Sequence, residues 1–256
     1  MSTGERRVCL ITGAGGTLGN VFCRSYYTEY DIVAVCRTRT PAVPSQLESF
    51  VDPLEPEKPV PENNSRVFVV RADLTVPGEV ERVVDLALAR YGKVDLLVNN
   101  AAHVQLQPRG IVDGDASLEQ FDPHFALNVA VPLRFAARLA QRSWLHAGAE
   151  NRAANRNIVN VSSISGSEVY PGQTLYSASK AALNQLTRNI ADEFAEFGVR
   201  ANAIAPTTFP ALVPTEQVAQ AIVELDGGSF TGGVFGVGAE PSGPDGAPAQ
   251  LAEAEQ

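Results

Sequence analysis

Tyr176 and Lys180 are the two residues whose types and spacing could carry out proton transfer. They lie four positions apart in Tyr176-Ser-Ala-Ser-Lys180, so on a helix they would share one face, about one turn apart. A nearby ammonium favours the phenolate and should lower the pKa of the phenol from its ordinary value near ~10. Such a phenol could exchange a proton with a carbonyl or alcohol oxygen. Two unrelated surface residues could show the same spacing, so the meaning of the pair depends on its surroundings.

The surrounding pattern predicts that a helix carries this pair. Apolar residues recur every three or four positions from Leu183 to Phe197, which is typical of an amphipathic helix. Near the start of the chain, residues 8–12 form a continuous apolar run, as expected of a strand that is buried in a parallel sheet.

A glycine-rich segment, Gly13-Ala-Gly-Gly-Thr-Leu-Gly19, follows that first strand and precedes a predicted helix over residues 20–30. Glycines let a backbone approach a pyrophosphate, and the free N–H groups at a helix start attract anions. The order of strand, glycine turn and helix therefore favours phosphate binding over a plain tight turn.

Arg37 follows a second predicted strand at residues 32–36, and Arg39 is close by. In a dinucleotide-binding βαβ unit, the residue at this strand end faces the adenosine ribose. An acidic residue would bond the 2′-hydroxyl, whereas an arginine accommodates a 2′-phosphate. Arg37 thus favours NADP(H) over NAD(H); the alternative is a solvated arginine at a strand end.

The rest of the chain alternates between strand and helix patterns. Asn128 lies inside a long predicted helix that is expected to break near Asp122 and bend at Pro132; a poor helix former there indicates a cap, a bend or a functional role. The alternation predicts an α/β fold, an open, doubly wound parallel sheet (a Rossmann fold) of about seven strands with helices on both faces. One domain is expected over residues 1–240, followed by a disordered tail at 241–256. Further strands are predicted at 67–70, 94–98, 158–161, 199–205 and 230–237, helices at 46–51, 78–91, 118–145 and 215–225, and a loop at 146–157.

Composition narrows the partners and the compartment. A formal net charge of −9 disfavours nucleic acid and anionic membranes as partners. Cys9, Cys23 and Cys36 lie in or beside apolar runs without a metal-binding spacing, so we expect reduced, buried thiols and no metal site. No signal-peptide pattern and no apolar run of membrane-spanning length is found, which predicts a cytoplasmic protein.

Over residues 6–238 the motifs resemble, in order, those of the short-chain dehydrogenase/reductase family. Thirteen positions separate Ser163 from Tyr176, which matches the spacing of that family. The motifs that carry the resemblance are Thr12-Gly13-x-x-Gly16-x-x-Gly19, Asp73-Leu74, Asn99-Asn100-Ala101, Asn128, Ser163, Tyr176-x-x-x-Lys180 and Val199-Arg-Ala-Asn-Ala-Ile-Ala-Pro206.

The resemblance implies four catalytic residues. Tyr176 would be the acid/base, and Lys180 would lower its pKa and hold the nicotinamide ribose. Ser163 would hydrogen-bond the substrate oxygen, with Ser162 as its rival. Asn128 would position a water in a proton relay leading out from Lys180, the alternative being that it merely distorts its helix.

The resemblance also implies an NADP(H) site. Asp73 and Leu74 would contact adenine, residues 100–102 would line the adenosine ribose, and the segment from Pro206 would meet the carboxamide. The implied cofactor-binding residues are Gly13, Gly16, Thr17, Leu18, Gly19, Arg37, Asp73, Leu74, Asn100, Ala101, Ala102, Tyr176, Lys180, Pro206 and Thr208.

Three positions depart from the family pattern. Thr17 stands where single-domain members have glycine, so the glycine spacing resembles that of extended members, which include epimerases and dehydratases. Thr207 replaces the glycine expected after Pro206. Only about ten residues separate Pro206 from the helix predicted at Thr215, where members usually have a longer flap.

The short segment predicts a solvent-open pocket, because closure normally sequesters the reaction. Such a site would suit a bulky or carrier-tethered substrate, or one that a neighbouring subunit covers. Pro108, Arg109 and the loop at 103–117 would then carry more of the specificity.

These observations favour an NAD(P)H-dependent ketoreductase or alcohol dehydrogenase that acts on a small-molecule carbonyl or secondary alcohol. An epimerase or dehydratase with a recycled cofactor is the alternative, and a non-enzymatic NADP-binding sensor is a third reading. Apolar stripes at 118–145 and 178–197 suggest, by resemblance, a homodimer or homotetramer.

Overall fold

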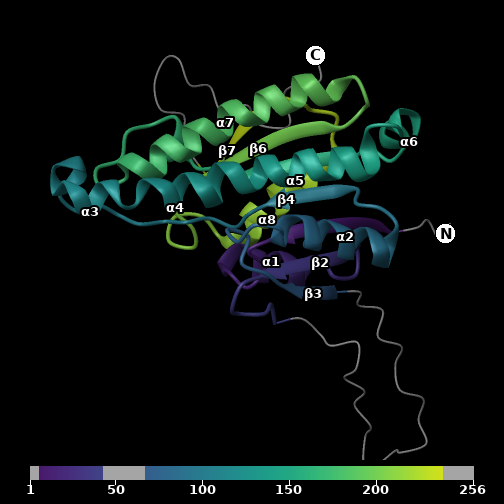
Figure 1. The fold of residues 1–256 in the computed structure, drawn as a ribbon, viewed down its shortest axis with the longest axis horizontal. Helices are drawn as coiled ribbons and strands as arrows, with labels where there is room; N and C mark the ends of the chain where they lie inside the picture. The colour runs from purple at the N-terminus through teal and green to yellow at the C-terminus, as the bar shows by residue number, and fades with distance from the viewer. Residues whose placement is uncertain (1–5, 43–66, 239–256) are drawn as a thin grey trace, which may run out of the picture.

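The computed structural model describes residues 6–42 and 67–238, which form one central sheet with helices on both faces (Figure 1). Its seven strands follow the order β3-β2-β1-β4-β5-β6-β7, and all neighbouring strands are parallel. The chain runs outward from β1 to β3 and then returns to β4 on the other side of β1. The predicted doubly wound sheet is confirmed, and this reversal marks where such sheets bind ligands, at the carboxyl ends of the strands.

The elements have the following bounds. The strands are β1 (Arg7–Thr12), β2 (Tyr30–Cys36), β3 (Val67–Arg71), β4 (Leu96–Asn99), β5 (Asn157–Val161), β6 (Arg200–Pro206) and β7 (Val234–Val237). The α-helices are α1 (Thr17–Tyr26), α2 (Glu79–Tyr91), α3 (Asp115–Leu118), α4 (Phe121–Phe125), α5 (Val131–Leu139), α6 (Gly148–Ala153), α7 (Thr174–Ala195) and α8 (Thr215–Gly227). Short 3₁₀ segments are η1 (Gly110–Asp113) and η4 (Ile164–Gly166), and π-helical turns are η2 (Ala126–Ala130) and η3 (Ala140–Trp144).

The sheet separates two apolar cores. One core packs α2, α5 and α7 against one face, and Figure 1 shows these helices side by side in front of the strands. The other core packs α1 and α8 against the opposite face. Strands β2, β4 and β5 are buried along their whole length, as expected of strands with mostly apolar sequences in a parallel sheet.

Several predicted bounds were wrong, including the start of the last strand, which begins at Val234 and not at residue 230. Helix α1 begins at Thr17 and ends at Tyr26, because Tyr30 already belongs to β2. The loop predicted at 146–157 contains α6. Its buried Asn151 donates side-chain hydrogen bonds to the carbonyls of Trp144 and Phe197, both at 2.7 Å, and these long-range contacts outweigh a weak local pattern. The helix predicted at 46–51 and the tail at 241–256 lie outside the described residues.

The long helix predicted at 118–145 is irregular in places that differ from the prediction. The break falls between α3 and α4 and precedes Asp122, which lies inside α4. Pro132 sits in the first turn of α5, where a missing N–H is tolerated. The distortion instead surrounds Asn128, which is buried at the centre of η2. Among the described helices, none is long and apolar enough to cross a membrane.

The connection from β6 to α8 consists of residues 207–214 and contains turns but no helix. Its start is fixed by the Thr207 N–H, which donates to the Val237 carbonyl at 3.1 Å. Val213 is buried in the core beneath α8. The short connection expected from the sequence is therefore present as a compact turn.

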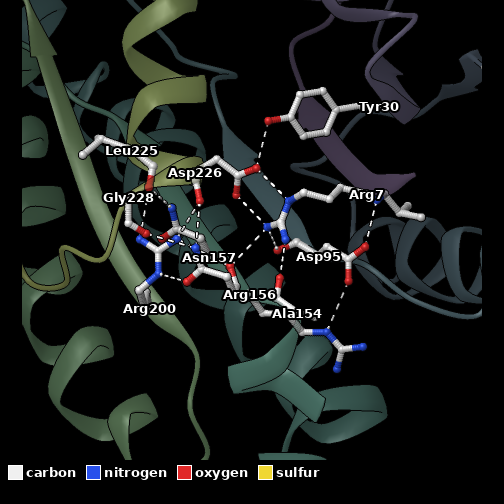
Figure 2. A network of polar contacts seen from close by, with 12 residues as sticks. Arg7, Tyr30, Asp95, Ala154, Arg156, Asn157, Arg200, Leu225, Asp226 and Gly228 are labelled. Atoms are coloured by element: carbon white, nitrogen blue, oxygen red, sulfur yellow. Dashed lines mark hydrogen bonds and ion pairs between the residues drawn. The ribbon is translucent and has the colours of Figure 1, made fainter. Parts of the chain in front are cut away.

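A buried polar network joins the amino ends of the strands, at the edge opposite their carboxyl ends (Figure 2). The Asp226 carboxylate, at the end of α8, accepts hydrogen bonds from Arg7 at 2.7 and 2.9 Å and from the Tyr30 hydroxyl at 2.8 Å. Asp95 accepts the Val8 N–H at 2.9 Å and pairs with Arg156 at 3.5 Å. Burial and the Asp226 charge raise the pKa of Tyr30 far above its ordinary value, so its hydroxyl stays a donor.

Candidate active site

The glycine turn forms one wall of a cavity of about 560 Å³ at the carboxyl ends of β1 and β4. Gly13 has a left-handed φ of +67°, and a Cβ there would lie 2.9 Å from the Ala101 Cα, so a side chain would be strained and would fill the cradle. Gly16 caps α1 without a side-chain acceptor. The first N–H groups of α1 therefore remain available to an anion.

The outer end of this cavity carries positive charge. Arg37 and Arg39 are exposed and line it beyond β2. Asp73 faces them across the cavity, and the pKa of its carboxyl is lowered, first by hydrogen bonds from Thr75 and then by the Arg37 charge. Two guanidinium groups beside one carboxylate suit a ligand that carries a phosphate at this end.

Most of the expected cofactor residues lie together around this cavity. Gly19 does not reach it, because it packs against the Gly13 carbonyl and Ala14 beneath the turn. The expected residues that line the cavity are Gly13, Gly16, Thr17, Leu18, Arg37, Asp73, Leu74, Asn100, Ala101 and Ala102.

A second cavity of about 270 Å³ adjoins the first, since Val104 and Phe209 line both. It holds Ser163 and Tyr176, together with Pro206 and Thr208 from the end of β6. Thr207 also lines this cavity, and its hydroxyl is buried without a hydrogen-bond partner among the described residues. A buried orphan hydroxyl fits a polar ligand group such as a carboxamide.

The structure reverses the expected electrostatics of Tyr176. Burial raises the pKa of its phenol, and the hydrogen bond with Ser163 opposes this rise without overcoming it. Lys180 Nζ lies 5.6 Å from the centre of the Tyr176 ring and donates to the Val161 carbonyl at 2.7 Å. The ammonium is therefore engaged with the end of β5, and burial dominates the pKa of the phenol.

Lys180 is itself shifted by its surroundings. It is 2% exposed and lines neither cavity. Burial lowers the pKa of its ammonium from 10.5 to about 8. A buried amine with one carbonyl partner loses much of the solvation that favours its charge.

The two serines after β5 point to different neighbours. The Ser162 hydroxyl donates to Asn184 Oδ1 at 2.5 Å, on the inner side of α7. Ser163 instead reaches Tyr176, so its position fits the role implied for it, whereas the hydroxyl of Ser162 is already bonded to α7.

Asn128 links the loop after β4 to α7. Its side chain accepts the His103 N–H at 2.7 Å, donates to the His103 carbonyl at 3.0 Å and donates to Ser179 Oγ at 2.9 Å. Ser179 in turn donates to the Tyr176 carbonyl at 2.7 Å. The π-helical turn thus holds both sides of the site in register, which explains a polar residue inside an apolar helix.

Some residues around the cavities were not expected. Gly15 approaches the Arg39 carbonyl so closely that a Cβ would clash with it; its place in a run of glycines was the available signal. From the loop at 103–117, His103 and Val104 line the cavities, while Pro108 and Arg109 do not. The further unexpected lining residues include Thr38, Thr75, Leu127, Ser165, Tyr170, Gln173 and Phe209.

Comparison with known proteins gives a consistent family assignment. The family model described as short chain dehydrogenase matches residues 7–220. The 2-(R)-hydroxypropyl-CoM dehydrogenase of Xanthobacter autotrophicus is 28% identical over 205 residues, covering 78% of this chain and 73% of that protein. Nodulation protein G of Rhizobium meliloti is 30% identical over 200 residues, covering 78% and 72%.

Solved structures show the same fold. The 3-ketoacyl-(acyl-carrier-protein) reductase of Brucella melitensis, complexed with NADH, superposes with a TM-score of 0.74 at 23% identity, covering 92% of this chain and 98% of that chain. A short-chain dehydrogenase/reductase of Serratia marcescens gives a TM-score of 0.68 at 19% identity, covering 90% and 95%.

Proposed function

The chain belongs to the short-chain dehydrogenase/reductase family, and from that premise we propose that it is an NADP(H)-dependent ketoreductase or alcohol dehydrogenase. The observation that carries the proposal is the convergence of Ser163 and Tyr176 on a cavity that adjoins the cavity lined by the glycine turn. A substrate oxygen in that cavity would lie among hydroxyl donors, beside a cleft suited to a nucleotide.

The cofactor would be held by groups that line the first cavity. The start of α1 would bind the pyrophosphate, and Arg37 with Arg39 would bind a 2′-phosphate. Asp73, Leu74 and residues 100–102 would line the adenosine. When bound, NADP(H) would supply or accept the hydride at nicotinamide C4.

The chain's own residues would handle the proton. Tyr176 would give its phenolic proton to the substrate oxygen during reduction and take one back during oxidation. Ser163 would donate a hydrogen bond to the same oxygen and hold it in place. Lys180 would hold the nicotinamide ribose, and Asn128 would position a relay water that returns protons to the site.

Substrate size follows from the short connection at 207–214. A turn of this length leaves the second cavity without a helical flap from this segment, which supports a site open enough for a bulky or carrier-tethered carbonyl compound. We extend the proposal to a cytoplasmic homodimer or homotetramer, for which light scattering of the purified protein is the test.

A kinetic panel tests the proposed reaction. The protein is incubated with NADPH and then with NADH against ketones, quinones and a β-ketoacyl thioester, and the nicotinamide absorbance is followed. Net oxidation, faster with NADPH, is the expected result. Product formed without net cofactor change would support an epimerase or dehydratase, which the glycine spacing around Thr17 favours. NADPH binding without product would support a sensor.

The choice of cofactor is tested separately at Arg37. Replacement by alanine should raise the KM for NADPH roughly 10- to 100-fold, since a charge-assisted phosphate contact is lost. The KM for NADH should change little. Arg188→Ala, which removes an exposed charge on α7, is the control. Equal losses with both cofactors would contradict a 2′-phosphate contact at Arg37.

A further inference from the structure

A chain of three hydrogen-bonding side chains lines the second cavity beside Tyr176. Ser163 Oγ lies 3.2 Å from Ser165 Oγ, and Ser165 Oγ lies 2.8 Å from Gln173 Oε1. All three residues face the cavity. The chain therefore leads from the hydroxyl that contacts Tyr176 to an amide at the start of α7.

Local backbone contacts fix the members of this chain. Ser163 caps η4, and its Oγ accepts the Ser165 N–H at 3.2 Å. Gln173 occupies the N-cap position of α7, where its carbonyl accepts the Ser177 N–H at 2.7 Å, yet its side chain makes no capping bond. N-cap positions favour Ser, Thr, Asp and Asn. Capping therefore does not explain a glutamine here, whereas its reach to Ser165 does.

The direction of donation along these three side chains decides where the hydroxyl proton of Ser163 points. Each serine hydroxyl has one proton to donate. With Oε1 of Gln173 facing Ser165, Ser165 donates to Gln173, so Ser163 must donate to Ser165. The proton of Ser163 is then directed at Ser165, away from any substrate oxygen and away from Tyr176, so in this direction Ser163 does not donate the hydrogen bond that favours the Tyr176 phenolate.

A rotation of the Gln173 amide reverses the direction of hydrogen-bond donation along the series Ser163, Ser165 and Gln173. The amide Nε2 would then donate to Ser165 Oγ, Ser165 would donate to Ser163, and the proton of Ser163 would be free to point into the cavity. The terminal torsion of glutamine is broad and roughly twofold. Within the described part of the chain, the bond to Ser165 is the one side-chain hydrogen bond of Gln173, so the rotation breaks no other contact.

We propose that Gln173 is a positioning residue that sets the direction of this chain, with the working direction running from Gln173 Nε2 through Ser165 and Ser163 to the substrate oxygen. Donors in series polarise one another, so Ser163 becomes a better donor to the oxygen on which charge develops. Gln173 acts through Ser165 and does not touch the reacting atoms. The inference rests on the proposed reductase function, because it requires a substrate oxygen at Ser163.

Gln173→Glu is the sharpest test, because an ionised glutamate has the same shape but can only accept hydrogen bonds. With NADPH and the panel ketone that the wild type reduces fastest, kcat should fall roughly 10- to 100-fold, somewhat less than the ~10²–10³ for a whole oxyanion donor. The KM for NADPH should not change. The loss should shrink as pH falls and the glutamate gains a donor proton. Gln217→Glu, on the exposed side of α8, controls for the added charge.

Two further variants separate this role from a merely structural one. Gln173→Leu, which neither donates nor accepts, should lower kcat by a factor that does not vary with pH. In a Ser165→Ala background, Gln173→Glu should cause no additional loss, because the link to Ser163 is already cut. Circular dichroism and NADPH binding report whether each variant folds.

Two outcomes would overturn the inference. One is a ratio of Gln173→Glu to wild-type kcat that stays constant with pH. The other is an undiminished effect of Gln173→Glu in the Ser165→Ala background. A wild-type protein that turns over no panel compound would contradict the proposed function itself, so the two failures are distinguishable.

Discussion

Burial acts in opposite directions on the two residues of the proton-transfer pair. It raises the pKa of the Tyr176 phenol and lowers the pKa of the Lys180 ammonium to about 8. In each case the uncharged form is favoured. The hydrogen bond with Ser163 is the influence that favours the phenolate, so the hydroxyls around Tyr176 matter as much as the nearby amine.

Replacing Tyr176 by phenylalanine should separate chemistry from binding. The ring that packs beside Lys180 remains, while the proton donor is lost, so kcat should fall by roughly 10²–10⁴-fold. The dissociation constant for NADPH, measured by fluorescence titration, should stay within a few-fold of the wild type. Turnover close to that of the wild type would exclude Tyr176 as the acid/base.

The pH dependence of stability should reveal the buried Lys180. Its pKa is about 8 in the folded chain and 10.5 ordinarily, so between these values the unfolded chain binds more protons. Stability must then rise with pH across this window. Relative to Lys180→Met, the wild-type free energy of unfolding should increase by on the order of 3 kcal/mol from pH 8 to 10.5. Urea titrations at several pH values measure it; a flat difference would contradict a depressed pKa.

The identities of these residues were predictable from the sequence, but their electrostatics were not. Helical spacing placed Tyr176 and Lys180 on one face, and the family resemblance added Ser163. Neither could show that Lys180 Nζ bonds the Val161 carbonyl, since that contact depends on how α7 packs across the end of β5. Gln173 was missed for the same reason, because its partner Ser165 belongs to a different element.

Among the elements, the π-helical turn η2 has the clearest positional role. It places Asn128 where one side chain bonds both backbone groups of His103 and the hydroxyl of Ser179. From the sequence, Asn128 was expected to cap its helix, to mark a bend or to have a functional role. The structure shows a local distortion of the helix together with a cross-link between two segments, which a pattern of hydrophobic spacing cannot reveal.

Asn128→Ala should loosen this link. It leaves the two partly buried backbone groups of His103 and the buried hydroxyl of Ser179 short of a partner, which should cost about 1–3 kcal/mol of stability. Hydrogen exchange of the His103 amide should speed up more than that of the β5 amides. Asn128→Asp, which keeps the acceptor for the His103 N–H, should retain more of the protection. Unchanged exchange at His103 would show that the loop is held by other contacts.

At the scale of the whole molecule, the carboxyl and amino ends of the strands have different roles. The cavities lie at the carboxyl ends of the strands, and the network around Asp226 joins their amino ends (Figure 2). The alternation of elements predicted the sheet, because each strand had its own apolar run. The network was not predicted, because Arg7, Asp95 and Asp226 are far apart in the chain. Each of them, taken alone in the sequence, resembles an ordinary surface charge.

Asp226→Asn should destabilise the whole fold. Asp226 is 2% exposed and accepts bonds from Arg7, whose side chain is 30% exposed, and from Tyr30. Loss of the charge in this partly buried pair should cost less than the roughly 3–5 kcal/mol of a fully buried one. Glu216→Gln breaks the exposed pair with Arg24 and should cost at most ~1 kcal/mol. Thermal and urea unfolding measure both. Equal effects of the two variants would contradict a structural role for the network.

The separation of the cavities from the Asp226 network, at opposite ends of the strands, has a practical consequence for directed evolution. Libraries that randomise the exposed residues within 103–117 and 207–214, and that spare the buried Gln107, Ser117 and Val213, change the surroundings of the cavities and leave every residue of the Asp226 network in place. Inactive members of such libraries should remain expressible and soluble. Screening for new substrates can therefore begin without a prior round of stabilisation.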